Sequence, residues 1–178
     1  MIRGIDEELR TRKYTHIERE RRFLVDPARR PDLLGCPSVL IEDRYIDGTR
    51  MRLRRMTASD TGRVVLKLTK KYETTDPRVQ PIVTTYLTAA EYTLFAALPA
   101  HRLVKRRHVA GNYSIDLFQG PLAGLELAES EQPDEAMLIA LAPPEWAVRE
   151  VSDDSRYTGG HLATLTDVEA AALCGDHR

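Results

Sequence analysis

The sequence predicts a mainly β protein, a closed eight-stranded antiparallel barrel with a few covering helices. Eight short stretches alternate between apolar and polar residues, as half-buried strands do. Most of them are joined by residues typical of tight turns, such as Asp47-Gly48 and Gly111-Asn112. Few segments carry a helical pattern, and closing such a sheet on itself leaves no exposed edge strand.

The composition is that of a globular chain, with 178 residues, 42% hydrophobic and 30% charged. This length argues for one domain, so we expect a polar extension at residues 1–15 and one barrel domain at residues 16–178. The net charge of −1 gives no overall attraction to nucleic acids or membranes. Cys36 and Cys174 lack metal-ligating neighbours, and no long apolar run occurs, so we expect a soluble cytoplasmic protein.

The predicted strands follow one another with short connections. The first runs from His16 to Val25 and ends at Asp26-Pro27, because proline cannot donate to a strand's hydrogen-bond ladder. A loop with three prolines follows at residues 26–37. The other strands are expected at residues 38–45, 49–56, 64–70, 80–87, 101–109, 113–118 and 125–131.

Helices are few, and they are expected at about residues 88–98, 134–141 and 166–174. The first and third begin at a capping box, in which a Thr side chain and a Glu three residues later each bond the other's backbone N–H. The first helix should cover the barrel through three side chains, Tyr92, Phe95 and Leu98. Residues 145–151 show no clear pattern.

Charge on the strands is the most informative feature, because strands normally carry few ionised side chains. In the first strand Glu18, Glu20 and Arg22 share one face, since successive side chains alternate. Two carboxylates so close repel each other unless a cation lies between them, and Mg²⁺ prefers such oxygen ligands. The other strands carry Arg52, Arg54, Lys67, Lys105, Arg107, Asp116, Glu129 and Glu131.

Two arrangements account for these charges. If they all turn inward, the barrel cannot have a dry core, because burying unpaired charges is costly. The lumen would then hold water, counter-ions and a charged ligand, and a polyphosphate with a divalent metal suits a mixture of Arg, Lys and carboxylates. If they turn outward, they form interleaved salt bridges on a solvated sheet. The spacing alone leaves both arrangements open.

Several short motifs follow one another along the chain. The first is Glu18-Arg19-Glu20-Arg21-Arg22, directly ahead of Phe23-Leu24-Val25. Their order and spacing resemble the CYTH domain, or triphosphate tunnel metalloenzyme family, over about residues 16–163. The first motif resembles the family's N-terminal ExExK signature. The other matching segments are residues 52–54, 66–69, 105–107, 113–118, 124–131 and 149–157, together with Trp146.

The resemblance implies a tunnel barrel that binds a triphosphate with Mg²⁺ or Mn²⁺, one metal positioning the substrate and a second activating water. It implies three catalytic residues, Glu18, Glu20 and Arg22. It implies five phosphate-binding residues, Arg52, Arg54, Lys67, Lys105 and Arg107. It implies five metal ligands, Glu18, Glu20, Glu129, Glu131 and, as the weakest candidate, Asp116.

Two departures from the family pattern bear on the chemistry. Arg22 stands where the signature ends in lysine, and arginine stays charged, so it cannot act as a base although it can bind phosphate. The fifth strand normally alternates Arg and Glu, but here residues 81–86 read Pro-Ile-Val-Thr-Thr-Tyr. One wall of the metal site would then be uncharged. This uncharged wall weighs against two-metal catalysis more than against phosphate binding.

Three functions follow from the resemblance. Metal-dependent hydrolysis of a triphosphate, with inorganic tripolyphosphate as the expected substrate, suits a bare domain without a base-recognition motif. A class IV type adenylate cyclase would need a nucleobase pocket, for which we find no motif. A non-catalytic polyphosphate or nucleotide binder would result if the two departures removed catalysis. We expect a small-molecule triphosphate as partner, no nucleic acid and no membrane, and a homodimer formed through an outer barrel face is compatible with the sequence.

Overall fold

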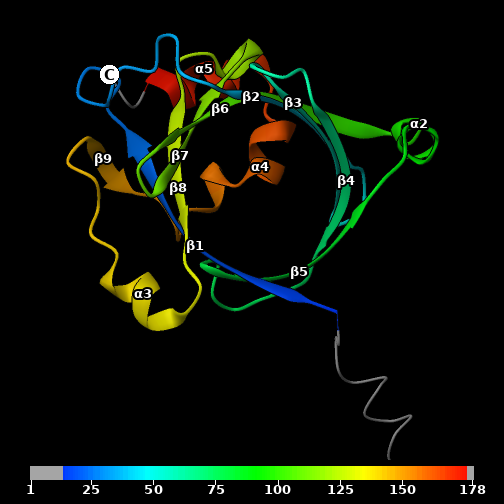
Figure 1. Ribbon diagram of the computed structural model, residues 1–178, viewed down its shortest axis with the longest axis horizontal. Helices are drawn as coiled ribbons and strands as arrows, with labels where there is room; N and C mark the ends of the chain where they lie inside the picture. The colour runs from blue at the N-terminus through cyan, green and yellow to red at the C-terminus, as the bar shows by residue number, and fades with distance from the viewer. Residues whose placement is uncertain (1–13, 176–178) are drawn as a thin grey trace, which may run out of the picture.

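The computed structural model describes residues 14–175, in which eight strands form a closed antiparallel barrel (Figure 1). The predicted extension at residues 1–15 lies almost wholly outside the described residues. The predicted fold class is confirmed. The barrel strands are β1 (His16–Val25), β2 (Val39–Ile46), β3 (Met51–Ala58), β4 (Val64–Lys71), β5 (Val79–Tyr86), β6 (Ala100–Ala110), β7 (Tyr113–Phe118) and β8 (Glu126–Glu131).

Strand β1 closes the barrel. Neighbouring strands follow the order β5-β4-β3-β2-β6-β7-β8-β1, and the first half of β1 pairs back onto β5, with Arg19 opposite Val79. The second half pairs with β8, with Arg22 opposite Glu129. A ninth strand, β9 (Ala147–Glu150), pairs with that second half as well, with Phe23 opposite Glu150. Strand β1 therefore has partners along both of its edges.

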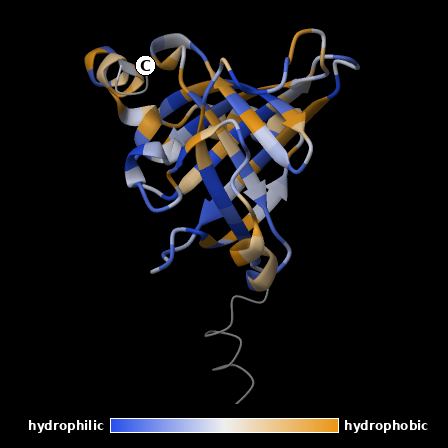
Figure 2. Ribbon diagram, turned by 90° about the vertical axis from the view of Figure 1, so that its left-hand side faces the viewer, coloured by the Kyte–Doolittle hydropathy of each residue, from blue (hydrophilic) through white to orange (hydrophobic). Residues whose placement is uncertain are grey.

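The strand boundaries lie within two residues of those predicted. The predicted turns at Gly48 and Gly111 have φ angles of 67° and 58°, a left-handed conformation that glycine adopts without a Cβ clash. Hydrophilic and hydrophobic residues follow one another along the strands, as the alternation predicts (Figure 2). Strand β9 is not predicted, because four residues are too few to show an alternation.

Helices cover the outside of the barrel. Helix α2 (Ala89–Ala96) starts at the predicted capping box and packs Tyr92 and Phe95 against Leu53 and Leu68, whereas Leu98, expected to join them, is 41% exposed. Helix α3 (Glu135–Ala140) is capped by the Asp134 side chain and contacts β1. Among residues 14–175, no helix has both the length and the apolar character that crossing a membrane requires.

One end of the barrel is filled by the chain that follows β9. This chain forms the short helices η2 (Ser155–Tyr157) and α4 (Gly159–Thr164) and helix α5 (Asp167–Gly175), and α4 lies within the ring of strands in Figure 1. A further short helix, η1 (Gly120–Leu122), packs on α5. We call four buried side chains of the segment after β9 the apolar plug: Tyr157, Leu162, Ala170 and Leu173. They form one core with Leu24, Leu103 and Leu127, which share strand faces with charged residues of the lumen.

Candidate functional site

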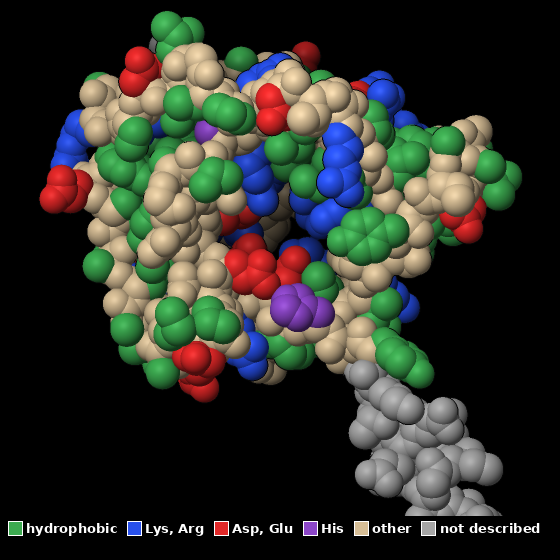
Figure 3. Space-filling view, in the orientation of Figure 1, with side chains coloured by type: hydrophobic (Ala, Val, Ile, Leu, Met, Phe, Trp, Pro, Cys, Tyr) green, Lys and Arg blue, Asp and Glu red, His purple; other side chains and the backbone are tan. Residues whose placement is uncertain are grey.

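The space enclosed by the strands, the lumen, contains a charged cavity of about 350 Å³ beside the apolar plug. Figure 3 shows the hollow, with basic and acidic side chains around it. The strand charges thus turn inward, which settles the choice that the sequence left open. The charged residues that line the cavity are Glu18, Glu20, Arg22, Arg52, Arg54, Lys71, Lys105, Arg107, Glu129 and Glu131.

Asp43 of β2 is a buried carboxylate that the sequence analysis missed. It accepts two hydrogen bonds from Arg54, from Nε at 2.6 Å and from Nη2 at 2.7 Å, and Arg52 lies 3.8 Å away. Burial alone would raise the pKa of Asp43, but Arg54 and Arg52 outweigh it and hold this pKa below its ordinary value. The pair fixes the direction in which Arg54 enters the lumen.

Asp116 of β7 is likewise a buried carboxylate, and it positions the two cations of β6. Its carboxylate accepts bonds from Arg107, Nε to Oδ1 and Nη2 to Oδ2, both at 2.6 Å, and is also paired with Lys105. The side chain of Asp116 has no exposed surface. Both of its oxygens are occupied by cations, which suits a residue that positions Lys105 and Arg107. Its part in metal binding stays a prediction.

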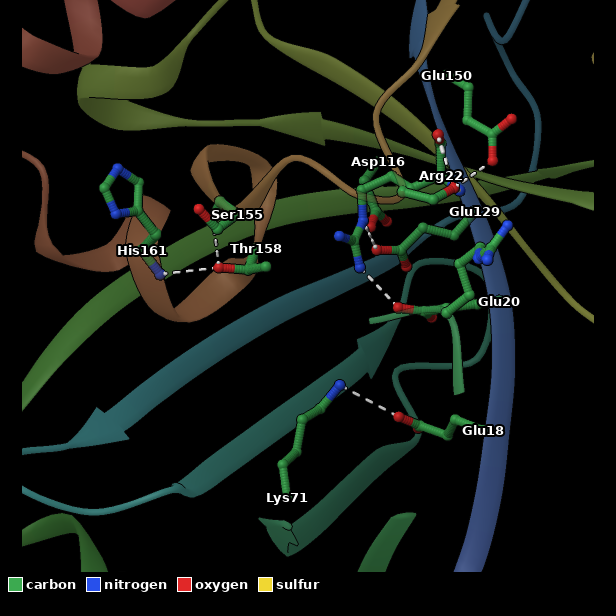
Figure 4. Close-up of polar contacts among 12 residues, drawn as sticks. Glu18, Glu20, Arg22, Lys71, Asp116, Glu129, Glu150, Ser155, Thr158 and His161 are labelled. Atoms are coloured by element: carbon green, nitrogen blue, oxygen red, sulfur yellow. Dashed lines mark hydrogen bonds and ion pairs between the residues drawn. The ribbon is translucent and has the colours of Figure 1, made fainter. Parts of the chain in front are cut away.

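Arg22 lies between two carboxylates (Figure 4). Its Nη2 donates to Oε1 of Glu20 at 2.6 Å, and its Nε donates to Oε1 of Glu129 at 3.0 Å. Burial and the nearby charge of Glu129 raise the pKa of Glu20. Burial also acts on Glu129, but Lys105, Arg107 and Arg22 outweigh it and hold the pKa of Glu129 well below its usual range.

The other two predicted metal-binding glutamates have different partners. Glu18 Oε2 is buried and accepts no hydrogen bond, although the Lys71 ammonium lies 3.2 Å away (Figure 4). The carboxylate of Glu131 bonds the ring of His16 at 3.0 Å, and its side chain is 54% exposed. Lys71 was not predicted, because the predicted strand ends at residue 70, one residue before the end of β4.

Comparisons with known proteins agree with this architecture. No family model matches the sequence, and no curated relative matches it. Among solved structures, the inorganic triphosphatase NE1496 superposes with a TM-score of 0.53 at 25% identity, covering 84% of this chain and 95% of that one. A structure described as the hypothetical protein NE1496 gives 0.52 at 28% identity, covering 82% and 97%. This chain has the triphosphate tunnel fold of the CYTH proteins.

More distant structures add nothing to this assignment. The PH1819 protein from Pyrococcus horikoshii OT3 superposes with a TM-score of 0.48 at 14% identity, covering 69% of this chain and 82% of that one. Similarity this low carries no argument about the site.

Within the triphosphate tunnel fold, Lys67 lies apart from the residues that line the cavity. It faces the same side of β4 as Thr69 and lies 5.7 Å from the centre of the Tyr86 ring. Burial lowers the pKa of Lys67, and the nearby charges of Arg54 and Arg52 lower it further. Lys67 is thus electrostatically connected to the two arginines, and binding of a negative group there would relieve their mutual repulsion.

The β5 wall of the tunnel is uncharged. Strand β5 contributes Gln80 to the cavity, and farther along Thr84 forms a hydrogen bond with Thr69 of β4 at 2.8 Å. Carboxylates therefore come from β1 and β8, on the opposite side of the closing seam.

The donor set of the lumen fits a hard divalent cation bound together with a substrate. Among the residues that the structure describes, no three His, Cys, Asp or Glu side chains form a ready metal cage. The available donors are carboxylate oxygens, however, and Glu18 Oε2 is buried and accepts no hydrogen bond, with the Lys71 ammonium 3.2 Å away. Mg²⁺ and Mn²⁺ take such oxygens, and Mg²⁺ typically uses one or two carboxylates plus substrate phosphates.

Proposed function

We propose that this protein hydrolyses a triphosphate in the lumen with the help of a divalent metal ion, and that inorganic tripolyphosphate is its substrate. The observation that carries the proposal is the convergence of four cations on one cavity that also holds carboxylates. These four are the predicted phosphate-binding residues that line the cavity, Arg52, Arg54, Lys105 and Arg107, and Arg22 and Lys71 line it as well. The NE1496 structure, named as an inorganic triphosphatase, supports the same activity at the level of the fold.

The cations are suited to phosphate groups. Arginine binds a phosphate through two parallel N–H groups, and its charge does not change in the physiological pH range. Among the described residues that line the cavity, Tyr45 is the only aromatic one, and it packs against Gly159 of α4. A nucleobase would therefore find no open aromatic surface in the cavity, which favours an inorganic triphosphate over ATP.

The carboxylates of the cavity are the groups that would bind the metal ion. Glu18, Glu20 and Glu131 would hold the metal, which when bound neutralises phosphate charge and lowers the pKa of water. Arg22 cannot accept a proton from the attacking water, because arginine stays charged.

The test is phosphate release from tripolyphosphate, ATP and thiamine triphosphate, with Mg²⁺, with Mn²⁺ and with a chelator. We expect release from tripolyphosphate with metal and none with the chelator. Glu18→Gln and Arg52→Gln should each lower the rate by roughly 100-fold, because each removes a charge that stabilises the transferred phosphoryl group. Arg52 is a cleaner target than Arg54, since Arg54 is also the hydrogen-bonded partner of Asp43.

The control is Glu73→Gln, which removes a carboxylate from an exposed pair with Arg50, outside the residues that line the cavity, and should leave the rate unchanged. Cyclic AMP formed from ATP would replace the proposal with a cyclase. Triphosphate binding that Arg52→Gln weakens, without phosphate release from any substrate, would identify a binding module instead.

A further inference from the structure

Arg22 occupies the place where a cation between two carboxylates is needed. Glu20 and Glu129 come from the paired strands β1 and β8, and one guanidinium bonds both of them, at 2.6 Å and 3.0 Å. The side chain of Arg22 is only 11% exposed, so these contacts lie out of bulk water. Arg22 thus already neutralises the carboxylate pair, without any bound ion.

A second arginine, Arg107, contacts the other oxygen of Glu129. Its second oxygen, Oε2, accepts a hydrogen bond from Nη2 of Arg107 at 2.6 Å. A divalent ion that approached Glu129 would have to displace Arg22 or Arg107 and would leave a buried guanidinium without its partner. Such a displacement is unfavourable, because a buried charge that loses its partner is strongly destabilising.

The remaining glutamates of the lumen are not enclosed in this way. Glu18 Oε2 accepts no hydrogen bond and has the Lys71 ammonium 3.2 Å away, and Glu131 is half exposed beside His16. The four predicted metal-binding glutamates therefore separate into two groups. Glu20 and Glu129 are bridged by Arg22, whereas Glu18 is paired with Lys71 and Glu131 with His16.

We infer that the Arg22 guanidinium is a fixed internal cation between Glu20 and Glu129, so that this lumen takes one divalent ion with its triphosphate and not two. The inference rests on the proposed function, since it assumes that a triphosphate and a divalent ion meet in this cavity. It also gives Arg22 a positioning role in place of the role expected from a lysine at this point in the motif: it holds two carboxylates together.

The experiment counts Mn²⁺ ions by electron paramagnetic resonance on the full chain in the presence of imidotriphosphate, a tripolyphosphate analogue with P–N–P bridges. We expect one Mn²⁺ per chain in the wild type. Arg22→Gln should bind two, because the freed carboxylates of Glu20 and Glu129 would then need a cation between them. Two ions on the wild type, none, or one ion on a folded Arg22→Gln variant would overturn the inference.

Two matched variants separate this role from a loss of charge. Arg52→Gln removes the same charge from the same cavity but leaves the Glu20–Glu129 bridge intact, so the count should stay at one while the analogue binds more weakly. The double variant Arg22→Gln/Glu129→Gln removes the carboxylate pair and should also bind one ion. A count of two in either variant would contradict the inference.

Circular dichroism establishes which variants fold. If Arg22→Gln does not, the wild-type count and the double variant still decide the question. The ion count needs no turnover, so its failure is distinct from failure of the proposed function, which would show as an absence of phosphate release.

Discussion

At the scale of single residues, the carboxylates of the lumen act mainly on arginine and lysine. Asp43 and Asp116 have no exposed side-chain surface, and each holds cations that come from neighbouring strands. Long basic side chains lose considerable conformational freedom when they are ordered. The buried acids thus fix the cations in position before any ligand arrives, which reduces the ordering that binding must supply.

Replacing Asp43 by Asn tests this arrangement. The change leaves Arg54, whose side chain is 9% exposed, as a buried cation without its charged partner. We expect the free energy of unfolding to fall by about 3–5 kcal/mol, as when one member of a buried ion pair is removed. Urea denaturation monitored by circular dichroism measures this loss.

The matched control is Glu73→Gln, which breaks an ion pair with Arg50 in which both side chains are more than half exposed. Solvent screens such pairs, so the free energy of unfolding should change by less than about 1 kcal/mol. Equal losses in the two variants would mean that the Asp43–Arg54 pair adds nothing beyond a surface contact.

The alternation along the strands predicted which charged side chains share a face, but not which of them form ion pairs. Glu42, Asp43 and Arg44 are consecutive charges on one strand, and nothing in that order indicates that the middle one is buried. Its partner is Arg54, which lies opposite it on β3. Similarly, the sequence identified Glu20, Arg22 and Glu129, while the bridge among them depends on the register between β1 and β8.

At the scale of elements, helix α4 packs on β6 and its first residue, Gly159, lies close to Tyr45 of β2. A Cβ atom on Gly159 would lie 2.0 Å from the hydroxyl oxygen of Tyr45. Burial, together with the charge of Asp43, raises the pKa of Tyr45 to about 12, so the hydroxyl is neutral at physiological pH. The end wall of the cavity is therefore a close contact between a helix backbone and a tyrosine.

The variants Gly159→Ala and Gly160→Ala form a matched pair for this contact. Gly159→Ala should lower the free energy of unfolding by about 1–3 kcal/mol, because the added methyl group overpacks the site. A Cβ on Gly160 would lie 3.8 Å from the Tyr45 ring, an ordinary contact, so Gly160→Ala should stabilise by up to about 1 kcal/mol through helix propensity.

Thermal unfolding of the two variants gives the comparison. Tyr45→Phe removes the hydroxyl and should recover part of the loss in Gly159→Ala. If both alanines had the same effect, the proximity of α4 to Tyr45 would not matter for stability.

The elements differ in how well sequence predicts them. The barrel strands and helix α2 carry alternation, turn glycines or a capping box, which are local signals. Helix α4 reads Gly-Gly-His-Leu-Ala-Thr, and two glycines at its start argue against a helix. It forms because Leu162 is buried in the apolar plug. Such tertiary stabilisation is not visible in a window of the sequence.

At the scale of the whole molecule, the charges in and around the lumen nearly cancel. Seven basic side chains (Arg22, Arg52, Arg54, Lys67, Lys71, Lys105 and Arg107) face six carboxylates (Glu18, Glu20, Asp43, Asp116, Glu129 and Glu131). A triphosphate brings several negative charges, which this nearly neutral lumen cannot balance alone. Binding of the substrate and of a divalent cation should therefore be strongly coupled.

Thermal shift measurements test this coupling. With imidotriphosphate and Mg²⁺ each at about 100 times the dissociation constant, binding should stabilise the protein by about 2.7 kcal/mol and raise Tm by roughly 5–10 °C. The analogue with a chelator, or Mg²⁺ alone, should give a much smaller rise. An equal rise with the analogue in chelator would show that the lumen needs no divalent ion to bind it.

Of the barrel strands, β1 is the first to leave the ribosome and the last that can complete its pairing. On one edge its partner is β5, which begins at Val79. On the other edge its partner is β8, more than a hundred residues after β1 itself. Pairings so distant in sequence form slowly, and an unpaired strand is a template for aggregation. In β1 the apolar end, Phe23 to Val25, follows directly after a run of charged residues that would discourage such contacts. The charges assigned to ligand binding would therefore also protect the nascent chain while it waits for its partners.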